Sequence, residues 1–513
     1  MPQRALALFG FLLFSVFIGM FVASCDVTGT VNMPDGGADV GLDASGDVAD
    51  LTTEDVALDL VDETSLDAAE LDASELDATS EDLVLDGVSD VADGVEETFD
   101  IPQPEGPAPY EFGLVQSPIT PWVVERFRAI AAAGTSQNDE VFMKVGDSIS
   151  ASAAFLNCFA SPVPNWGAYA GLASTVDAFN AVSLPGGSTS FNRTSAAVEV
   201  GRTASWALSG SPAPINVELA AIEPRFAVVM YGSNDIGWFG SDHAATLRWY
   251  GDNMLALVDR LLQQGVIPIL STIPPRDDSA ADDYWVPTFN GFVRALAQAR
   301  QVPLTDFHQT LLPLPSHGLG SDHLHPNVGP GGGCDLSASG LQYGQNTRNQ
   351  ITLEALDRVR RAFAGEPPPD AEVLSVEGQG VPSEPMRIAS LPFVHSGDTS
   401  QSSSRALSLY SGCSATQNES GPEVVYELQI DTPSALRFAV VDGPGVDIDL
   451  HLLSGSVSES ACIARAHTAF SRTLAPGTYY LVADTFVGSG GGEESGEYFL
   501  VVMPCAAGDP ECQ

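Results

Sequence analysis

The chain has 513 residues, 44% of them hydrophobic, and a formal net charge of −46. This length is enough for two domains joined by linkers, and the hydrophobic content is enough for real cores. The strong negative charge excludes nucleic acid as a partner, because the phosphate backbone would be repelled.

The N-terminus has the layout of an export signal, with Arg4, an apolar run over 5–22 and then Ala-Ser-Cys25. The sequence before Cys25 resembles a bacterial lipobox. That resemblance implies that residues 1–24 are a lipoprotein signal peptide and that Cys25 is lipidated. We therefore expect an extracytoplasmic protein, periplasmic or at the cell surface, anchored to a bacterial membrane through its N-terminal lipid. The alternative is an uncleaved membrane anchor, since the apolar run is near the length needed to span a bilayer.

Residues 25–106 form a strongly acidic segment. Positions 26–105 hold 25 acidic residues and no lysine or arginine, and Leu-Asp-Ala units recur every five residues from Leu66. This period does not fit an amphipathic helix, and like charges extend a chain. We interpret the segment as a disordered, solvated tether; calcium or cell-wall binding by its acids is the less favoured alternative.

Residues 107–365 alternate apolar strands with amphipathic helices. Continuous apolar strands alternating with helices predict an α/β fold with a parallel sheet covered on both faces. In such sheets the site lies beyond the carboxyl ends of the strands. The predicted strands lie near Val141 and at 196–200, 226–230, 266–270 and 302–307, and the predicted helices at 122–133, 244–264, 292–300 and 351–363.

A linker over 366–372, which contains three prolines, separates this domain from residues 373–513. The later segment has short β-prone runs broken by Gly, Ser and Pro, which predict an all-β sandwich. The clearest runs lie at 424–430, 436–441, 478–483 and 498–502.

The cysteines are compatible with disulfides in an exported chain. Cys25 stands apart, which leaves six others whose pairing the sequence does not fix. The pairs we favour are Cys158–Cys334, Cys413–Cys462 and Cys505–Cys512. No cysteine or histidine cluster has zinc spacing, so we expect no metal site.

Three polar groups follow predicted strands or the end of the sheet. Ser148 lies at a strand-to-helix turn, where it is either a helix N-cap or a nucleophile beside unpaired backbone N–H groups. Asn234 follows the strand at 226–230 and offers a side-chain N–H. Asp322 and His325 are three residues apart, close enough for the carboxylate to orient the imidazole. Together they fill the roles of nucleophile, base and orienting acid.

These residues resemble the GDSL/SGNH hydrolase family over roughly 107–365. Gly146-Asp147-Ser148 matches its nucleophile block, 232–235 its Gly-x-Asn-Asp block, and Asp322-x-x-His325-Pro its final block. The resemblance implies a three-layer α/β/α, flavodoxin-like domain with a five-stranded parallel sheet. It also implies ester hydrolysis through an acyl-serine, with Ser148, Asp322 and His325 catalytic and no cofactor or metal.

The same resemblance implies an oxyanion hole formed by Ser148, Gly201 and Asn234. Gly201 is our choice for the family's glycine, with Gly186 or Gly187 as alternatives, because it follows a predicted strand. His323 competes with His325 as the base, and the following proline favours His325.

Two further interpretations concern residues near the predicted site. Lys144, the chain's one lysine, is interpreted as reaching solvent from the end of its strand. A set of aromatic residues either stacks on a sugar or packs under a lid, and we leave both alternatives open; these are Trp166, Tyr169, Trp206 and Trp238.

An extracytoplasmic location favours carbohydrate O-acetyl esters or lipids as substrates. The alternatives are a catalytically silent surface binding protein and an acyltransferase acting on carbohydrate. The C-terminal segment resembles the bacterial pre-peptidase C-terminal domain, a non-catalytic β-sandwich, and is a candidate to bind polysaccharide or another surface component. We interpret Asp447 and Asp449 as alternating on a solvent-facing strand, because a calcium site needs more oxygen ligands.

Overall fold

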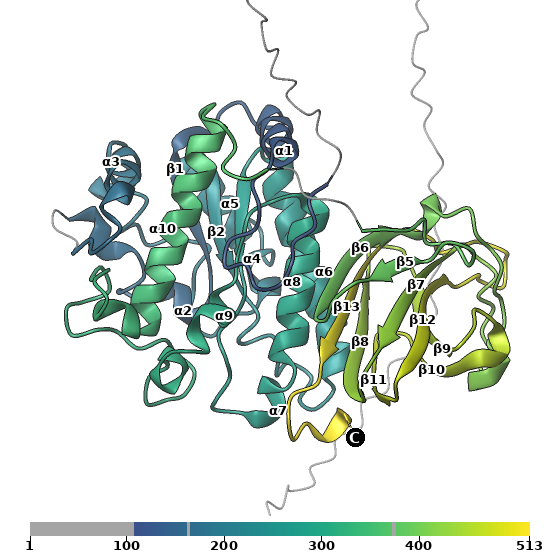
Figure 1. Ribbon diagram of the computed structural model, residues 1–513. Helices are drawn as coiled ribbons and strands as arrows, with labels where there is room; N and C mark the ends of the chain where they lie inside the picture. The colour runs from purple at the N-terminus through teal and green to yellow at the C-terminus, as the bar shows by residue number, and fades with distance from the viewer. Residues whose placement is uncertain (1–106, 162–164, 372–375, 513) are drawn as a thin grey trace, which may run out of the picture. The chain divides into compact units, whose positions relative to one another are not determined.

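The computed structural model describes residues 107–161, 165–371 and 376–512 (Figure 1). The predicted signal peptide at 1–24, the lipidation site at Cys25 and the tether at 25–106 lie outside these ranges. Within them, no helix is both long and apolar enough to cross a membrane.

The first domain is built on a sheet of four parallel strands in the order β1-β2-β3-β4. These are β1 (Asn138–Gly146), β2 (Pro224–Met230), β3 (Ile267–Ser271) and β4 (Leu304–Thr305). Every residue of β2 and β3 is buried, as expected of strands covered by helices on both faces. The predicted α/β fold with a parallel sheet is confirmed.

The expected fifth strand at 196–200 is wrong as a strand. That run meets β1 through a single parallel bridge between Gly146 and Val198. Gly146 N donates to Ala197 O at 3.1 Å, Glu199 N donates to Gly146 O at 3.2 Å, and the chain then turns away at Gly201. The small side chains of Ser195, Ala196 and Ala197 give this segment little surface to pair along β1.

The longer helices connect the strands, and short helices lie within the connecting loops. α1 begins at Pro121 after the Thr120 cap, and α6 begins after Asp242, whose side chain accepts from Ala245 N. The longer helices are α1 (Pro121–Ala132), α3 (Ala173–Asn180), α5 (Pro214–Ile222), α6 (His243–Gln263), α8 (Val286–Arg300) and α10 (Gly344–Phe363). The short ones are α2 (Ser148–Ala151), α4 (Ala204–Ala207), α7 (Ala280–Asp283) and α9 (Phe307–Leu311).

The C-terminal segment is a β-sandwich, as predicted. One sheet has the order β10-β9-β12-β7-β5 and the other β11-β8-β13-β6; all pairs are antiparallel except β5 with β7. Side chains of both sheets share one core, including Tyr426, Phe438, Leu450 and Leu500. The strands are β5 (Met386–Ile388), β6 (Phe393–Asp398), β7 (Glu423–Ile430), β8 (Ser434–Asp442), β9 (Ile448–Ser454), β10 (Cys462–Ala466), β11 (Ala469–Leu474), β12 (Gly477–Thr485) and β13 (Glu497–Pro504).

The outer face of the four-stranded sheet packs against α6 and α8 of the first domain. Two helix glycines permit this approach: a Cβ on Gly251 would lie 2.4 Å from Val441 Cγ1, and one on Gly291 would lie 2.6 Å from Val501 Cγ1. Phe292 and Phe499 meet edge to face at 5.6 Å. The two domains therefore share a continuous apolar core rather than joining only through the linker.

All three favoured disulfide pairs are present. Cys158–Cys334 joins the loop after α2 to the loop before α10, and it links residues 176 positions apart. Cys413–Cys462 and Cys505–Cys512 lie in the C-terminal segment. Cys158–Cys334 closes the longest loop of the three and therefore constrains the unfolded chain most.

Candidate active site

The turn after β1 presents Ser148 at the first position of α2. Gly146 is required there, because a Cβ would lie 2.6 Å from Met230 O on the neighbouring strand. Asp147 is the N-cap, and its buried carboxylate accepts from Ile149 N at 3.0 Å. Asp147 therefore caps the helix, and the Ser148 hydroxyl is not used as a cap.

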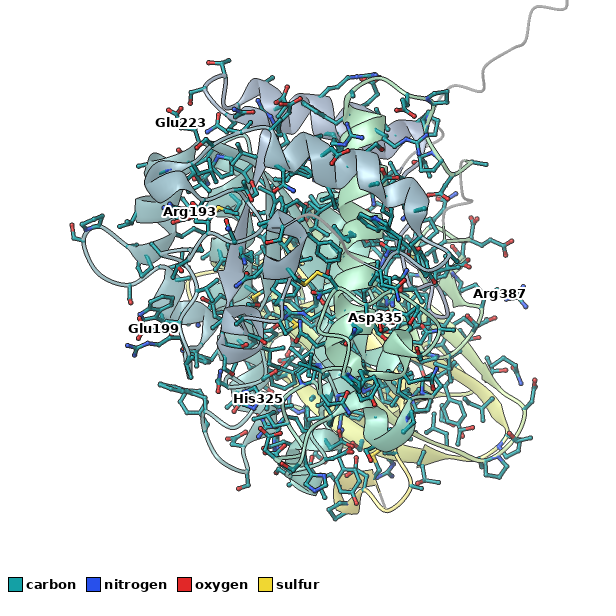
Figure 2. The ribbon with its side chains drawn as sticks, turned by 90° about the vertical axis from the view of Figure 1, so that its left-hand side faces the viewer. Arg193, Glu199, Glu223, His325, Asp335 and Arg387 are labelled. Carbon is teal, nitrogen blue, oxygen red and sulfur yellow. A yellow bond between two sulfur atoms is a disulfide. The ribbon has the colours of Figure 1, made fainter. Side chains whose placement is uncertain are left out.

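A chain of hydrogen bonds runs from Ser148 through His325 to Asp322. Ser148 Oγ lies 2.8 Å from His325 Nε2, and His325 Nδ1 lies 2.7 Å from Asp322 Oδ2. Asp322 Oδ1 also accepts from the backbone N–H groups of Leu324 and His325 at 3.2 and 3.1 Å. Slight desolvation raises the pKa of Asp322, but these hydrogen bonds outweigh it and hold that pKa below the usual value. The His325 side chain, labelled in Figure 2, is 42% exposed.

Arg348 on α10 supports the nucleophile turn, and sequence reasoning missed it. Its guanidinium, 1% exposed, donates to Ile149 O at 2.6 Å and to Ser150 Oγ at 2.9 Å. The cation also lies 3.7 Å from the centre of the Phe155 ring. Arg348 thus holds α2, the short helix that begins with Ser148, through two of its residues.

The interpretation of Lys144 as reaching solvent is wrong. The side chain is 5% exposed, and its ammonium donates to Asn157 Oδ1 and to Phe191 O, each at 2.8 Å. Burial lowers the pKa of Lys144 to about 8. The lysine joins β1 to the loops on one side of the sheet and has no contact with Ser148.

Asn234 and the segment at Gly201 lie next to each other. Asn234 Nδ2 donates to Arg202 O at 3.0 Å and lies 3.4 Å from Asp147 Oδ2. Gly201 has a φ of 76°, a left-handed conformation that favours glycine. The alternatives Gly186 and Gly187 lie in a separate turn, in which Gly187 N already donates to Leu184 O at 3.0 Å.

Arg276 and Asp235 hold the Asn234 turn in place. Arg276 Nη1 donates to Ser233 O at 2.5 Å, while the Asp235 carboxylate accepts from Gly232 N at 3.1 Å and Ala204 N at 2.9 Å. Burial raises the pKa of Asp235 to about 7 and that of Asp147 to about 6, and the neighbouring Asp147 further raises that of Asp235. Both carboxyl groups thus hold the backbone of the turns around the site through hydrogen bonds to N–H groups. The sequence did not predict this role for Asp235.

The aromatic residues divide into two kinds. Trp166, Tyr169 and Trp206 are partly buried against the domain core. Trp238 is 54% exposed and stacks on Trp249 with ring centres 5.0 Å apart. Trp238 N donates to Asp235 O, so the stacked pair of Trp238 and Trp249 adjoins the turn that contains Asn234.

Residues 145–328 match the GDSL-like Lipase/Acylhydrolase family. No curated protein matches the chain. Among solved structures, Axe2, an acetylxylan esterase from Geobacillus stearothermophilus, is 17% identical (TM-score 0.28) over 43% of this chain and 95% of that one. The esterase EstA from Pseudoalteromonas sp. is 16% identical (TM-score 0.26) over 42% and 97%.

The C-terminal segment resembles the pre-peptidase C-terminal domain of a collagenase from Bacillus anthracis. That similarity is 17% identity with a TM-score of 0.16, over 23% of this chain and 91% of the other.

Proposed function

We propose that this chain, a GDSL-type hydrolase that acts on esters, uses Ser148 as nucleophile, His325 as general base and Asp322 to orient the imidazole. The observation that carries the proposal is the pair of short contacts from Ser148 Oγ to His325 Nε2 and from His325 Nδ1 to Asp322 Oδ2. A neutral serine is a poor nucleophile, and an imidazole held in one tautomer is the group that can take its proton.

The reaction proceeds in two acyl-transfer steps. Ser148 Oγ attacks the ester carbonyl carbon as its proton passes to His325 Nε2. The bond between carbonyl carbon and alcohol oxygen then breaks, and the leaving alcohol takes that proton. Water, deprotonated by the same imidazole, hydrolyses the acyl-serine and restores Ser148. Asp322 stabilises the imidazolium that forms in each step.

The oxyanion hole combines the backbone N–H groups of Ser148 and Gly201 with the Asn234 side chain. Asn234 uses one N–H on Arg202 O, which fixes the plane of its amide beside the Gly201 segment. The contact with Asp147 Oδ2, at 3.4 Å, is long, so it competes only weakly with a developing oxyanion for the second N–H.

Carbohydrate O-acetyl esters are the substrate class we favour, with lipid esters as the other class. The exposed Trp238 offers an apolar face four residues from Asn234, which suits stacking on a sugar ring. An extracytoplasmic position, held by lipid at Cys25 and the acidic tether, would bring such esters within reach. The disulfides are in keeping with an oxidising compartment.

An ester panel tests this proposal. We expect the purified chain to release acetate from p-nitrophenyl acetate and from acetylated xylan faster than it releases long-chain fatty acid from a lipid ester. Added sugar acceptors should leave the acetate yield unchanged, whereas acyltransferase activity would move acetyl groups to the sugar. No hydrolysis of any ester would contradict the catalytic roles and favour a silent binding protein.

Asn234→Ala should lower kcat for p-nitrophenyl acetate by about 10²–10³-fold, the usual cost of one oxyanion donor. KM should change little, because the donor acts on charge that develops after the ester binds. Steady-state kinetics check this, with Asn138→Ala as the matched control at an exposed asparagine that starts β1. A change in KM alone would assign Asn234 to ground-state binding instead.

A further inference from the structure

A row of carboxylates crosses the outer face of the five-stranded sheet in the C-terminal domain. Asp484 on β12 lies opposite Glu423 on β7 and opposite Asp449 on β9. Like charges directly opposite each other destabilise a sheet unless something compensates them. None of the three is on a solvent-facing strand, since each is at most 4% exposed. The expectation of a solvent-facing Asp449 is therefore wrong.

The segment before β7 buries this face. Tyr410 stacks on His451 of β9 with ring centres 3.5 Å apart and 6° between planes, and Glu419 closes over the same region. Glu419 and His451 are both 0% exposed. Neither nitrogen of His451 has a hydrogen-bond partner among the described residues, and the Glu419 carboxyl has only the acidic side chain of Asp449 beside it. Leaving such groups buried and unpaired costs free energy, so a missing partner is indicated.

Two of the other carboxylates have donors of their own. Asp484 accepts from the Tyr410 hydroxyl and from Thr485 N, and Glu423 accepts from the Ser404 hydroxyl and Ala406 N. These contacts satisfy Glu423 and Asp484. The residues of the cluster that remain to be accounted for are Asp449, Glu419 and His451.

Asp449 forms an ion pair with His467, which comes from the chain between β10 and β11. Its Nδ1 lies 3.3 Å from Asp449 Oδ1 and 3.0 Å from Asp447 Oδ1. His467 is 41% exposed and reaches the outer edge of the cluster rather than Glu419. Arg465 on β10 lies opposite His451 and bonds Gln417, so among the described residues the cations beside the site are His467 and Arg465, and neither is hydrogen-bonded to Glu419.

We propose that Glu419, Asp449 and His451 bind a divalent metal ion of the zinc class. Their donor atoms, one from each residue, all lie within 4.8 Å of one another. Two carboxylates and one imidazole are a ligand set that zinc accepts, with a fourth position left for water. Calcium and magnesium prefer oxygen ligands alone, so the histidine selects against them.

The metal would link the segment before β7 to β9. This structural role is independent of ester hydrolysis. The test uses the full chain, treated with a chelator and kept without reductant so that its disulfides stay closed. We expect calorimetry to show one zinc ion bound per chain, and zinc to raise the melting temperature. Hydrolysis of p-nitrophenyl acetate should be the same with and without zinc.

Variants locate the site. Glu419→Gln and His451→Phe preserve shape and stacking but remove a ligand, and each should weaken zinc binding at least about 100-fold. His395→Phe is the matched control, because this half-buried histidine of the same domain already bonds the Tyr426 hydroxyl. Circular dichroism identifies a variant that fails to fold, and the zinc content and binding of the parent chain test the proposal without any variant.

Three results would overturn the site. The first is zinc binding that His451→Phe leaves unchanged, and the second is calcium binding that competes with zinc equally well. The third is zinc binding only after reduction, because Cys413 and Cys462 lie close enough to His451 to bind a metal once their disulfide opens. An absence of zinc binding by the chelator-treated parent chain would be equally decisive.

Discussion

Replacing Ser148 with alanine should lower kcat for p-nitrophenyl acetate by about 10⁴–10⁶-fold, the scale seen when a nucleophile is removed from a serine hydrolase. In the proposed mechanism this hydroxyl forms the acyl intermediate, and its contact with His325 Nε2 at 2.8 Å lets the imidazole take its proton. Folding should be unaffected, because the cap of α2 is Asp147 and not Ser148.

Ser152→Ala is the control for this variant. Ser152 lies four residues further on, at the end of the same short helix, and its hydroxyl accepts from Ala154 N rather than contacting His325. Mass spectrometry with a slow ester should also trap an acyl group on Ser148 in the parent and none in Ser148→Ala. Full activity in Ser148→Ala would contradict the acyl-serine mechanism.

The strands that frame the site were predictable, because parallel strands buried on both faces have continuous apolar sequences. Phe226–Met230 illustrates this, since all five residues of the run are buried. The run at 196–200 has a similar local pattern but pairs only at Val198. Local sequence does not show where an edge segment leaves the sheet, because that depends on how much side-chain surface its neighbour offers.

Polar residues buried by distant loops were beyond local prediction. The first part of α10 has no apolar period, so only its later part, 351–363, was predicted as a helix. In the structure Asn346 Nδ2 donates to Gly332 O at 2.7 Å and Asn349 Nδ2 donates to Ala154 O at 2.8 Å. These asparagines, like Arg348, hold the loops around Ser148. Their burial depends on backbone carbonyls far away in sequence.

The candidate catalytic groups were predictable for a different reason. Ser148, Asn234 and His325 are defined by residue type and by position at a strand or sheet end, which a sequence displays directly. Asp449 shows the opposite case: the expectation that it faces solvent is wrong, because alternation along β9 does not show what covers that side of the sheet. The cover comes from the segment around Tyr410, which no period in the sequence connects to β9.

The choice between two neighbouring histidines gives the second large effect. His325→Gln should lower kcat for p-nitrophenyl acetate by about 10⁴–10⁶-fold, because no other imidazole is hydrogen-bonded to Ser148. His323→Gln should retain most of the parent activity. His323 has a φ of 60° in a turn where its N–H donates to Gly320 O at 3.0 Å, and it shares no hydrogen bond with Asp322 or Ser148 among those of the described residues.

The pair of variants is informative because the two residues share one loop and one side-chain type. If the imidazoles served only to stabilise the loop, both variants would lower the melting temperature of the protein to a similar extent. Base catalysis instead separates them: kcat falls in His325→Gln with the melting temperature nearly unchanged, since the side chain is 42% exposed. Loss of activity in His323→Gln with retention in His325→Gln would reverse the assignment and would require Asp322 to orient a ring that it does not contact in this structure.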